Sequence, residues 1–225
     1  MKILNLYAGI GGNRKLWGND HDITAVEIDE SIATVYSDMY PDDTVIVGDA
    51  HEYLLWHYSE YEFIWSSPPC PTHSRARYGL GVHGHGYCYV YPDMKLYQEI
   101  ILLKSIFKGE WVVENVMPYY DYLIEPTQKI GRHAYWSSFH INLMEESQNN
   151  LICGHTKPTN AIGKVRGELK RLQKIHDISL DKYTGIDKRK CLRNAVSPKS
   201  GLHILNCALN KPTFEQMELF KGKVK

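Results

Sequence analysis

A short apolar run that ends in a cluster of glycines limits how this chain can fold more than any other segment. Residues 3–7 are apolar in the manner of a buried strand, Gly9, Gly11 and Gly12 follow, and residues 13–17 are compatible with a helix. Glycines let the backbone approach a ligand closely, and a helix N-terminus offers unpaired N–H groups. The segment therefore predicts a strand, a glycine turn and a helix, an arrangement that could bind a ligand, although a tight turn without a ligand would need the same glycines.

The first 140 residues continue this alternation of strands and helices. Apolar runs predict further strands at residues 23–28, 44–47, 62–65, 111–113 and 132–139. Helix-compatible segments lie between them, at residues 29–40, 50–57 and 93–107. Strands that alternate with helices predict an α/β fold with a Rossmann-like, mostly parallel sheet covered on both faces.

Composition places the chain among soluble globular proteins. It has 225 residues, of which 43% are hydrophobic and 23% charged, and this suits one domain with an appendage. The sequence has neither an apolar segment of membrane-spanning length nor a secretory leader, so we expect a soluble, cytoplasmic protein. The five dispersed cysteines should be free thiols, and neither they nor the eleven histidines have the spacing of a metal site.

The net charge of zero hides two segments of opposite sign. Residues 1–60 carry three basic residues against eleven acidic ones, whereas residues 157–193 carry eleven basic against four acidic. Periodicity fades over residues 142–190, so we expect a short basic appendage there, beside a core formed by residues 1–141 and 191–225. Six side chains are its candidate contacts to a phosphate backbone: Lys157, Lys164, Arg166, Lys170, Arg171 and Lys174. A solvated helix face would explain the same charges equally well.

Acidic side chains follow the second and third predicted strands. Glu27 comes near the roughly 20-residue spacing at which an acid after the glycine turn can bind ribose hydroxyls. Asp49 follows the next strand, where a carboxylate could accept a hydrogen bond from an adenine amino group. Because the carboxyl ends of parallel strands meet at one edge of a sheet, the glycine turn and both acids would face one ligand, and together they suggest a nucleoside-bearing cofactor.

A cysteine between prolines follows the fourth predicted strand. Residues 66–71 read Ser-Ser-Pro-Pro-Cys-Pro, and the prolines stiffen the loop that presents Cys70. A thiol there is placed to be a nucleophile, whereas many free cysteines only fill space. Glu114 ends the next strand and could donate a proton in the same crevice, unless it is merely a solvated acid. The glycine-rich residues 71–92 predict a mobile lid.

In these segments the sequence resembles the cytosine-C5 DNA methyltransferases, which use S-adenosylmethionine (SAM). Residues 5–12, Asn-Leu-Tyr-Ala-Gly-Ile-Gly-Gly, look like the first cofactor motif of that family, and residues 67–70 look like its Pro-Cys motif. Residues 114–116 look like its Glu-Asn-Val motif. Residues 193–196, Arg-Asn-Ala-Val, look like the Asn-containing motif that folds back beside the first one, and the four segments occur in the family's order.

The resemblance covers residues 3–140 and 190–208 and implies a role for each matched side chain. Cys70 would attack C6 of a cytosine, Glu114 would hold N3 and the exocyclic amine while delivering a proton, and Arg132 would hold O2. The target base lies inside the stacked duplex, so it would be extruded into the pocket and covered by the predicted lid. SAM would be the methyl donor and S-adenosylhomocysteine (SAH) the product, with contacts from Tyr7, Gly9, Gly11, Glu27, Asp49, Pro69 and Asn194.

Four positions depart from the family pattern. Asn5 replaces the usual aspartate, Pro71 replaces a glutamine after the cysteine, Ile130 stands where an arginine is usual, and Ala195 replaces a common serine. The target-recognition segment, residues 142–190, is also much shorter than usual. Since sequence is specified by groove contacts, the short segment predicts a short or relaxed recognition site.

Several alternatives remain open at this point. The same chemistry on RNA, or a non-catalytic relative that binds SAM or nucleic acid, would fit a chain with these departures. A nicotinamide-dependent oxidoreductase would explain the glycine turn but not the Pro-Cys and Glu-Asn-Val segments. The favoured expectation is a monomeric enzyme, without a metal, that acts on double-stranded DNA in a phage or restriction-modification setting.

Overall fold

Seven strands form one mixed sheet in the computed structural model of the protein, which describes residues 1–75, 90–142 and 167–210. The strands are β1 (Lys2–Leu6), β2 (Asp22–Glu27), β3 (Thr44–Val47), β4 (Phe63–Ser66), β5 (Glu110–Val116), β6 (Gln128–Ile130) and β7 (His133–Ser137). Their order is β3-β2-β1-β4-β5-β7-β6; β1 to β5 are parallel, whereas β7 is antiparallel to both β5 and β6. The prediction of a mostly parallel α/β sheet is confirmed.

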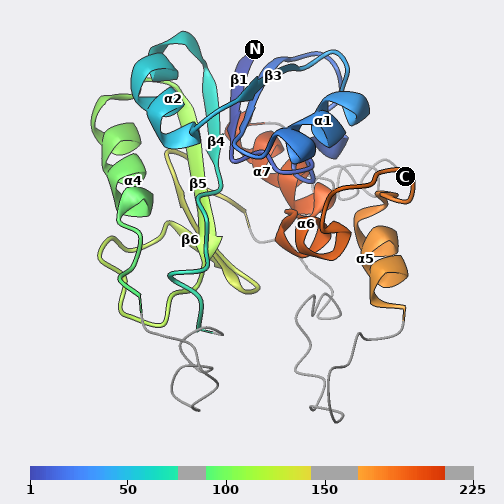
Figure 1. The fold of residues 1–225 in the computed structure, drawn as a ribbon. Helices are drawn as coiled ribbons and strands as arrows, with labels where there is room; N and C mark the ends of the chain where they lie inside the picture. The colour runs from blue at the N-terminus through green and yellow to red at the C-terminus, as the bar shows by residue number, and fades with distance from the viewer. Residues whose placement is uncertain (76–89, 143–166, 211–225) are drawn as a thin grey trace, which may run out of the picture.

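Helices cover both faces of this sheet. The helical segments are η1 (Arg14–Leu16), α1 (Glu30–Met39), α2 (Ala50–His57), η2 (Tyr58–Glu60), α4 (Lys95–Ile106), α5 (Glu168–His176), α6 (Lys188–Asn194) and α7 (Pro198–Ala208). Figure 1 shows α2 and α4 on one side of the sheet and α1, α6 and α7 on the other. None of the helices in the described ranges is long and apolar enough to cross a membrane.

The strands divide their side chains between two apolar layers because successive residues point to opposite faces. On β1, Leu4 packs in the cluster that contains Leu54 of α2 and Ile100 of α4. Its neighbour Ile3 packs on the other face, in the cluster that contains Ile204 of α7. Both clusters are fully or almost fully buried, so the sheet is fixed between its two helical layers.

Aspartates directly after β2 and β3 begin the helices that follow. The Asp29 carboxylate accepts hydrogen bonds from the N–H groups of Ser31 and Ile32, at 2.9 and 3.2 Å, and caps α1. Asp49 caps α2 in the same way. These caps turn the chain sharply at the carboxyl edge of the sheet, where the predicted site residues lie.

One helix prediction is wrong, because residues 13–17 form only the short turn η1. Helix α7 packs closely against this segment, so that a side chain at Gly201 would meet the backbone oxygen of Asn13 at 2.3 Å. The turn therefore packs under another helix instead of extending into its own.

The fading periodicity after residue 142 also concealed helices. Leu172 of α5, together with Ile178 and Leu180, packs in one cluster with Ile10 and Val35. The described part of the basic segment thus rests on the glycine turn and on α1. Where the domain boundary falls stays a prediction.

Candidate active site

The glycine turn is held in an unusual conformation by tight packing. Tyr7, its first residue, has a φ of 55°, in the left-handed region that residues with a side chain rarely adopt. A side chain at Gly12 would lie 2.4 Å from the backbone oxygen of Val196. The segment around Val196 therefore lies against the turn, as the resemblance implies for its fourth motif.

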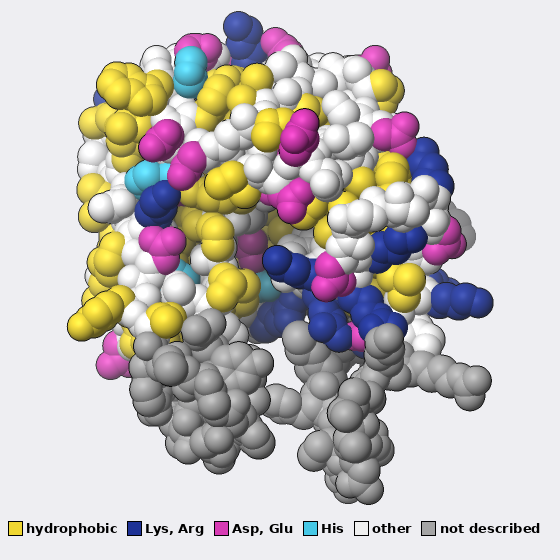
Figure 2. Space-filling view, viewed as in Figure 1, with side chains coloured by type: hydrophobic (Ala, Val, Ile, Leu, Met, Phe, Trp, Pro, Cys, Tyr) yellow, Lys and Arg dark blue, Asp and Glu magenta, His cyan; other side chains and the backbone are white. Residues whose placement is uncertain are grey.

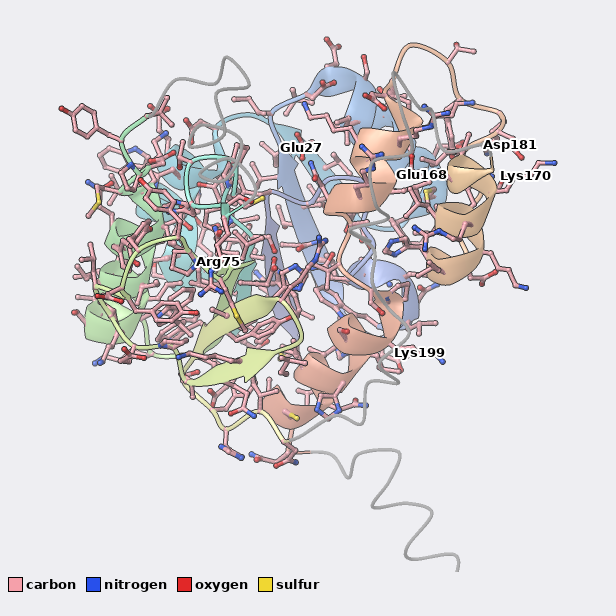
Figure 3. All side chains as sticks on the ribbon, turned by 90° about the horizontal axis from the view of Figure 1, so that it is seen from below. Glu27, Arg75, Glu168, Lys170, Asp181 and Lys199 are labelled. Carbon is pink, nitrogen blue, oxygen red and sulfur yellow. The ribbon has the colours of Figure 1, made fainter. Side chains whose placement is uncertain are left out.

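Glu27 is bound to the turn from the end of β2. Its carboxylate accepts hydrogen bonds from the backbone N–H of Gly9 at 2.9 Å and of Asp29 at 3.0 Å. The side chain is 9% exposed, and each oxygen keeps a second lone pair that a ribose hydroxyl could use. The structure thus brings Glu27 and Gly9 together. Figure 3 labels Glu27 at the edge of the sheet that carries the other strand ends.

The carboxylate of Asp49 has more polar partners than that of Glu27. One oxygen accepts from the N–H groups of His51 and Glu52, and the other lies 3.1 Å from Nζ of Lys95 on α4. Burial opposes the charge of Asp49, but the hydrogen bonds from Lys95 and from the backbone outweigh it and lower the pKa of the carboxyl group. An adenine amino group would find a charged acceptor with one oxygen partly available.

Two exposed apolar side chains at this edge escaped the sequence analysis. Ile28 directly follows Glu27 and is 69% exposed, and Val47, the last residue of β3, is 54% exposed. The two side chains add apolar surface to the edge of the sheet that carries Glu27 and Asp49. Their signal in the sequence is their position beside the predicted ribose and adenine contacts.

A buried glutamate beneath the site was also missed. Glu99 of α4 is 1% exposed, and its carboxylate accepts from the hydroxyl groups of Tyr7 and Ser66 at 2.5 and 2.6 Å. Nδ1 of His51 lies 2.9 Å from the same carboxylate. Burial and the charge of Glu99 raise the pKa of Tyr7, so its hydroxyl keeps the proton that it donates. The available signal was an acid on the helix stripe that also contains Leu96 and Leu103.

The loop that carries Cys70 is folded tightly onto β5. The carbonyl of Cys70 accepts from the backbone N–H groups of His73 and Ser74 at 3.0 and 3.1 Å. The side-chain amide of Asn115 donates to the carbonyl of Pro68 at 2.9 Å. Cys70 itself is half-buried and is not part of a disulfide.

Glu114 lies on the strand next to this loop. β4 and β5 run parallel with Ser66 opposite Val113, so Glu114, still within β5, lies beside the point where the chain leaves β4 toward the Pro-Pro-Cys segment. Glu114 is 7% exposed, and Nε2 of His133 on β7 lies 3.6 Å from its carboxylate. The structure therefore brings together the neighbourhoods of Cys70 and Glu114, which are distant in sequence.

Arg132 sits on the turn between β6 and β7 and faces the C-terminal motif. Its carbonyl accepts from the N–H of Met117 at 3.0 Å, and its guanidinium donates to the carbonyl of Arg193 at 3.4 Å. Arg193 in turn pairs with Glu168 at 2.6 Å, and Figure 3 shows Glu168 where α5 meets α6. Asn194, the last residue of α6, is exposed.

The four departures from the family pattern have local partners or positions. Asn5 is fully buried and accepts from the amide of Asn13 at 2.8 Å. Ile130 belongs to β6 and packs against the cluster around α7, and Ala195 packs in the cluster around Leu172. Pro71 is exposed directly after Cys70.

The basic candidates divide between described and undescribed residues. Lys157, Lys164 and Arg166 lie outside the described residues, as does most of the predicted lid, whereas Lys170, Arg171 and Lys174 are exposed on α5. Figure 2 shows Lys and Arg side chains gathered over α6, beside a hollow bordered by hydrophobic side chains. Figure 3 shows Lys170 pointing away from the molecule on α5.

The sheet order and the site together define a Rossmann-like α/β protein with a proline-flanked thiol and a buried carboxylate at one sheet edge. The family model for C-5 cytosine-specific DNA methylase matches residues 1–116. This covers half of the chain, and the protein belongs to that family.

Several solved structures are similar to this chain, and the first named here has the same fold. The methyltransferase EhMeth of Entamoeba histolytica is 14% identical, with 93% of this chain and 98% of that chain covered and a TM-score of 0.54. DNMT2 of Spodoptera frugiperda, solved as a mutant, is 24% identical, with 51% of this chain and 35% of that chain covered and a TM-score of 0.34. A SAM-dependent methyltransferase from Agrobacterium tumefaciens is 15% identical, with 53% and 40% covered and a TM-score of 0.39. The comparison with curated proteins found no match.

Proposed function

We propose that the protein is a DNA (cytosine-5-)-methyltransferase that transfers a methyl group from SAM to a cytosine extruded from double-stranded DNA. The observation that carries the proposal is the hydrogen bond from the side-chain amide of Asn115 to the carbonyl of Pro68. This bond joins the residue after Glu114 to the loop that carries Cys70, so the two proposed catalytic side chains lie on segments in direct contact. Membership of the family supports the class of reaction.

The residues at the sheet edge fit a nucleoside-bearing methyl donor. The glycine turn leaves Gly9 accessible beside Glu27, whose free lone pairs can accept from ribose hydroxyls. Ile28 and Val47 offer apolar surface to an adenine ring, and Asp49 offers a charged acceptor. Bound SAM would supply an electrophilic methyl group to this site.

The side chains of the chain would carry the remaining steps. The Cys70 thiolate forms a bond to C6 of the cytosine, while Glu114 protonates N3 and Arg132 holds O2, so that the negative charge at C5 is stabilised. C5 would then take the methyl group, its proton would pass to water, and re-formation of the 5,6 double bond would expel Cys70 as a thiolate. N3 would return its proton to Glu114, so one full turnover restores both residues.

Double-stranded DNA as the substrate is supported by the exposed basic side chains of α5 and by the cluster over α6. Lys170, Arg171 and Lys174 would bind phosphates, and so would Lys157, Lys164 and Arg166. Residues 71–92 would close over the extruded base. A soluble monomer in the cytoplasm of the host cell completes the proposal.

The test is transfer of labelled methyl groups from SAM to cytosine-containing duplex DNA. We expect transfer by the wild type and at least a thousandfold loss in Cys70→Ser, because an alkoxide is hard to form without a strong base. Cys207→Ser is the matched control, because Cys207 lies on α7 in the core. A fully active Cys70→Ser enzyme would contradict the mechanism.

Parallel reactions with transfer RNA, and trapping on duplex DNA that contains 5-fluorocytosine, separate the alternatives. Labelling of RNA alone would replace the DNA substrate by RNA. Binding of SAM without transfer to either, and without a trapped adduct, would identify a non-catalytic relative.

A further inference from the structure

The buried carboxylate of Glu99 joins three separate segments of the candidate site. It accepts hydrogen bonds from Tyr7, at the start of the glycine turn, and from Ser66, at the end of β4, and it pairs with His51 in the first turn of α2. We call these four residues the Glu99 clasp. A charged group with 1% exposure costs free energy unless it is fully paired, so the clasp is not a feature that core packing alone requires.

Each arm of the clasp ends next to a residue with a proposed role. Tyr7 adopts its left-handed conformation two residues before Gly9, and Ser66 lies four residues before Cys70. His51 lies two residues after Asp49, which is bound to Lys95 on the same helix as Glu99. Helix α4 therefore contacts the proposed cofactor loop, the adenine acceptor and the base of the nucleophile loop through two charged side chains.

We propose that Glu99 is a positioning residue that fixes the glycine turn and the nucleophile loop relative to each other. This inference rests on the proposed function, in which those two segments hold the methyl donor and the attacking thiol. Methyl transfer needs the donor carbon, the methyl group and C5 in line, and a displacement of about 1 Å can cost roughly a hundredfold in rate. A single carboxylate that binds both segments removes one way in which they could shift apart.

Glu99 acts through its partners and not on the substrate. Its side chain is fully buried, and both oxygens are occupied by Tyr7, Ser66 and His51. The hydrogen bond to Glu99 raises the pKa of His51, which favours a positive charge opposite the carboxylate. The neighbouring charges are Lys95, which opposes that protonation, and Asp49, which favours it.

The decisive variant is Glu99→Gln, which keeps the size of the side chain but can accept on one side only. Tyr7 and His51 bind one carboxylate oxygen of Glu99 and Ser66 binds the other. The amide NH2 of Gln would replace one of these two acceptors with a donor, so the partners of that oxygen must rearrange. We expect the dissociation constant for SAH to rise about tenfold and the single-turnover methylation rate at saturating SAM to fall about tenfold or more. The melting temperature of each variant gives the folded fraction against which both values are corrected.

Two controls separate positioning from loss of stability. Leu103→Val removes a methylene from the same buried side of α4, one turn beyond Glu99 and outside the clasp, and should lower the melting temperature without changing the SAH affinity or the rate. Gln98→Ala alters the exposed neighbour of Glu99 and should change none of these quantities.

The single arms provide a readout that a merely structural role would not change. Tyr7→Phe should weaken SAH binding more than it lowers the rate at saturating SAM, whereas Ser66→Ala should lower that rate with SAH affinity unchanged. In the Glu99→Gln background each second substitution should add little, because residues that act through one partner are not additive. Unchanged SAH affinity and rate in Glu99→Gln, or losses no larger than those of Leu103→Val at equal stability, would overturn the inference.

Failure of the proposed function is recognised separately. If the wild type binds SAH but methylates no cytosine, the proposed function is wrong, and the affinity measurement still decides the clasp. A tenfold weaker SAH complex in Glu99→Gln then supports it, and equal affinity overturns it. A wild type that does not bind SAH would overturn both the proposed function and the inference about Glu99.

Discussion

Individual residues explain why substitutions at family positions leave this chain well packed. Asn5 stands where an aspartate is usual, yet it is fully buried and paired with the amide of Asn13. Two amides can exchange a donor and an acceptor without a buried charge, so the pair satisfies itself. The departure is thus matched by a second residue eight positions later, a pairing that the sequence alone does not reveal.

His51 gives a pH-dependent contribution to stability that can be measured. Its pKa in the folded protein is raised above the ordinary 6.5 by the hydrogen bond to Glu99, so folding favours the protonated ring. The stabilisation is complete below 6.5 and is lost as the pH rises through the raised value. We expect the free energy of unfolding of the wild type to exceed that of His51→Gln. The difference should be largest at about pH 5.5 and smallest at about pH 8.5.

Urea unfolding of the two proteins across this range checks the prediction. Burial lowers the pKa of His73 and of His176, and their protonation destabilises the fold in acid. Both histidines are present in both proteins, so they cancel in the difference. A difference that grows with pH would contradict the assignment of the His51 and Glu99 pair.

At the scale of elements, a buried ion pair holds the glycine turn against α1 and β3. Arg14 of η1 donates twice to Asp43, which directly precedes β3, at 2.8 and 2.9 Å. The side chains are 4% and 2% exposed, and the hydroxyl of Tyr36 on α1 donates to the same carboxylate. Three elements therefore share one carboxylate that water does not reach.

Arg14→Met should destabilise the protein by about 3–5 kcal/mol, because it leaves the buried carboxylate without its cation. The double variant Arg14→Met with Asp43→Leu should recover part of this loss, since both charges are then absent. Denaturant unfolding with a constant slope measures both. A loss below about 1 kcal/mol in Arg14→Met would show that the pair is not buried as described.

The elements also show where sequence reasoning succeeds. The predicted strand at residues 44–47 and the predicted helix at residues 50–57 agree with the structure at both ends. The strand is a short apolar run, and the helix begins directly after its capping residue Asp49. Helix α5 was missed because its apolar positions, among them Leu169 and Leu172, are surrounded by lysine and arginine. Its packing partner Ile10 is far away in sequence, so no local pattern could supply it.

The candidate site divides in the same way. The predicted strand ends place Glu27, Cys70 and Glu114 at the same edge of the sheet, since the carboxyl ends of parallel strands meet there. Glu99 was not found because its role depends on hydroxyl groups from two other elements. Long-range partners of this kind are set by the packing of the helix and not by its own sequence.

At the scale of the whole molecule, the two oppositely charged segments of the sequence are in contact. Lys15 pairs with Asp177 at 2.7 Å, and Lys182 pairs with Asp38 at 2.6 Å. Lys182 is thus a basic side chain of the basic segment that pairs within the protein. The side chains of Lys170 and Arg171 lie on the exposed face of α5, where the proposed function requires them to bind phosphate.

Neutralising these two should change the salt dependence of DNA binding. Each phosphate contact contributes about −0.9 to the slope of log K against log salt, so Lys170→Gln with Arg171→Gln should reduce its magnitude by about 2. Lys104→Gln on α4, on the other side of the sheet, is the control and should leave the slope unchanged. An unchanged slope in the double variant would assign the two residues to a solvated helix face.

The contact between Gly12 and Val196 constrains the order in which the protein can be made. The glycine turn is synthesised some 180 residues before the backbone that fits against it. The nascent chain must therefore carry an incomplete turn while the intervening residues are made. Competence to bind a nucleoside would arise only when the segment around Val196 docks onto the turn.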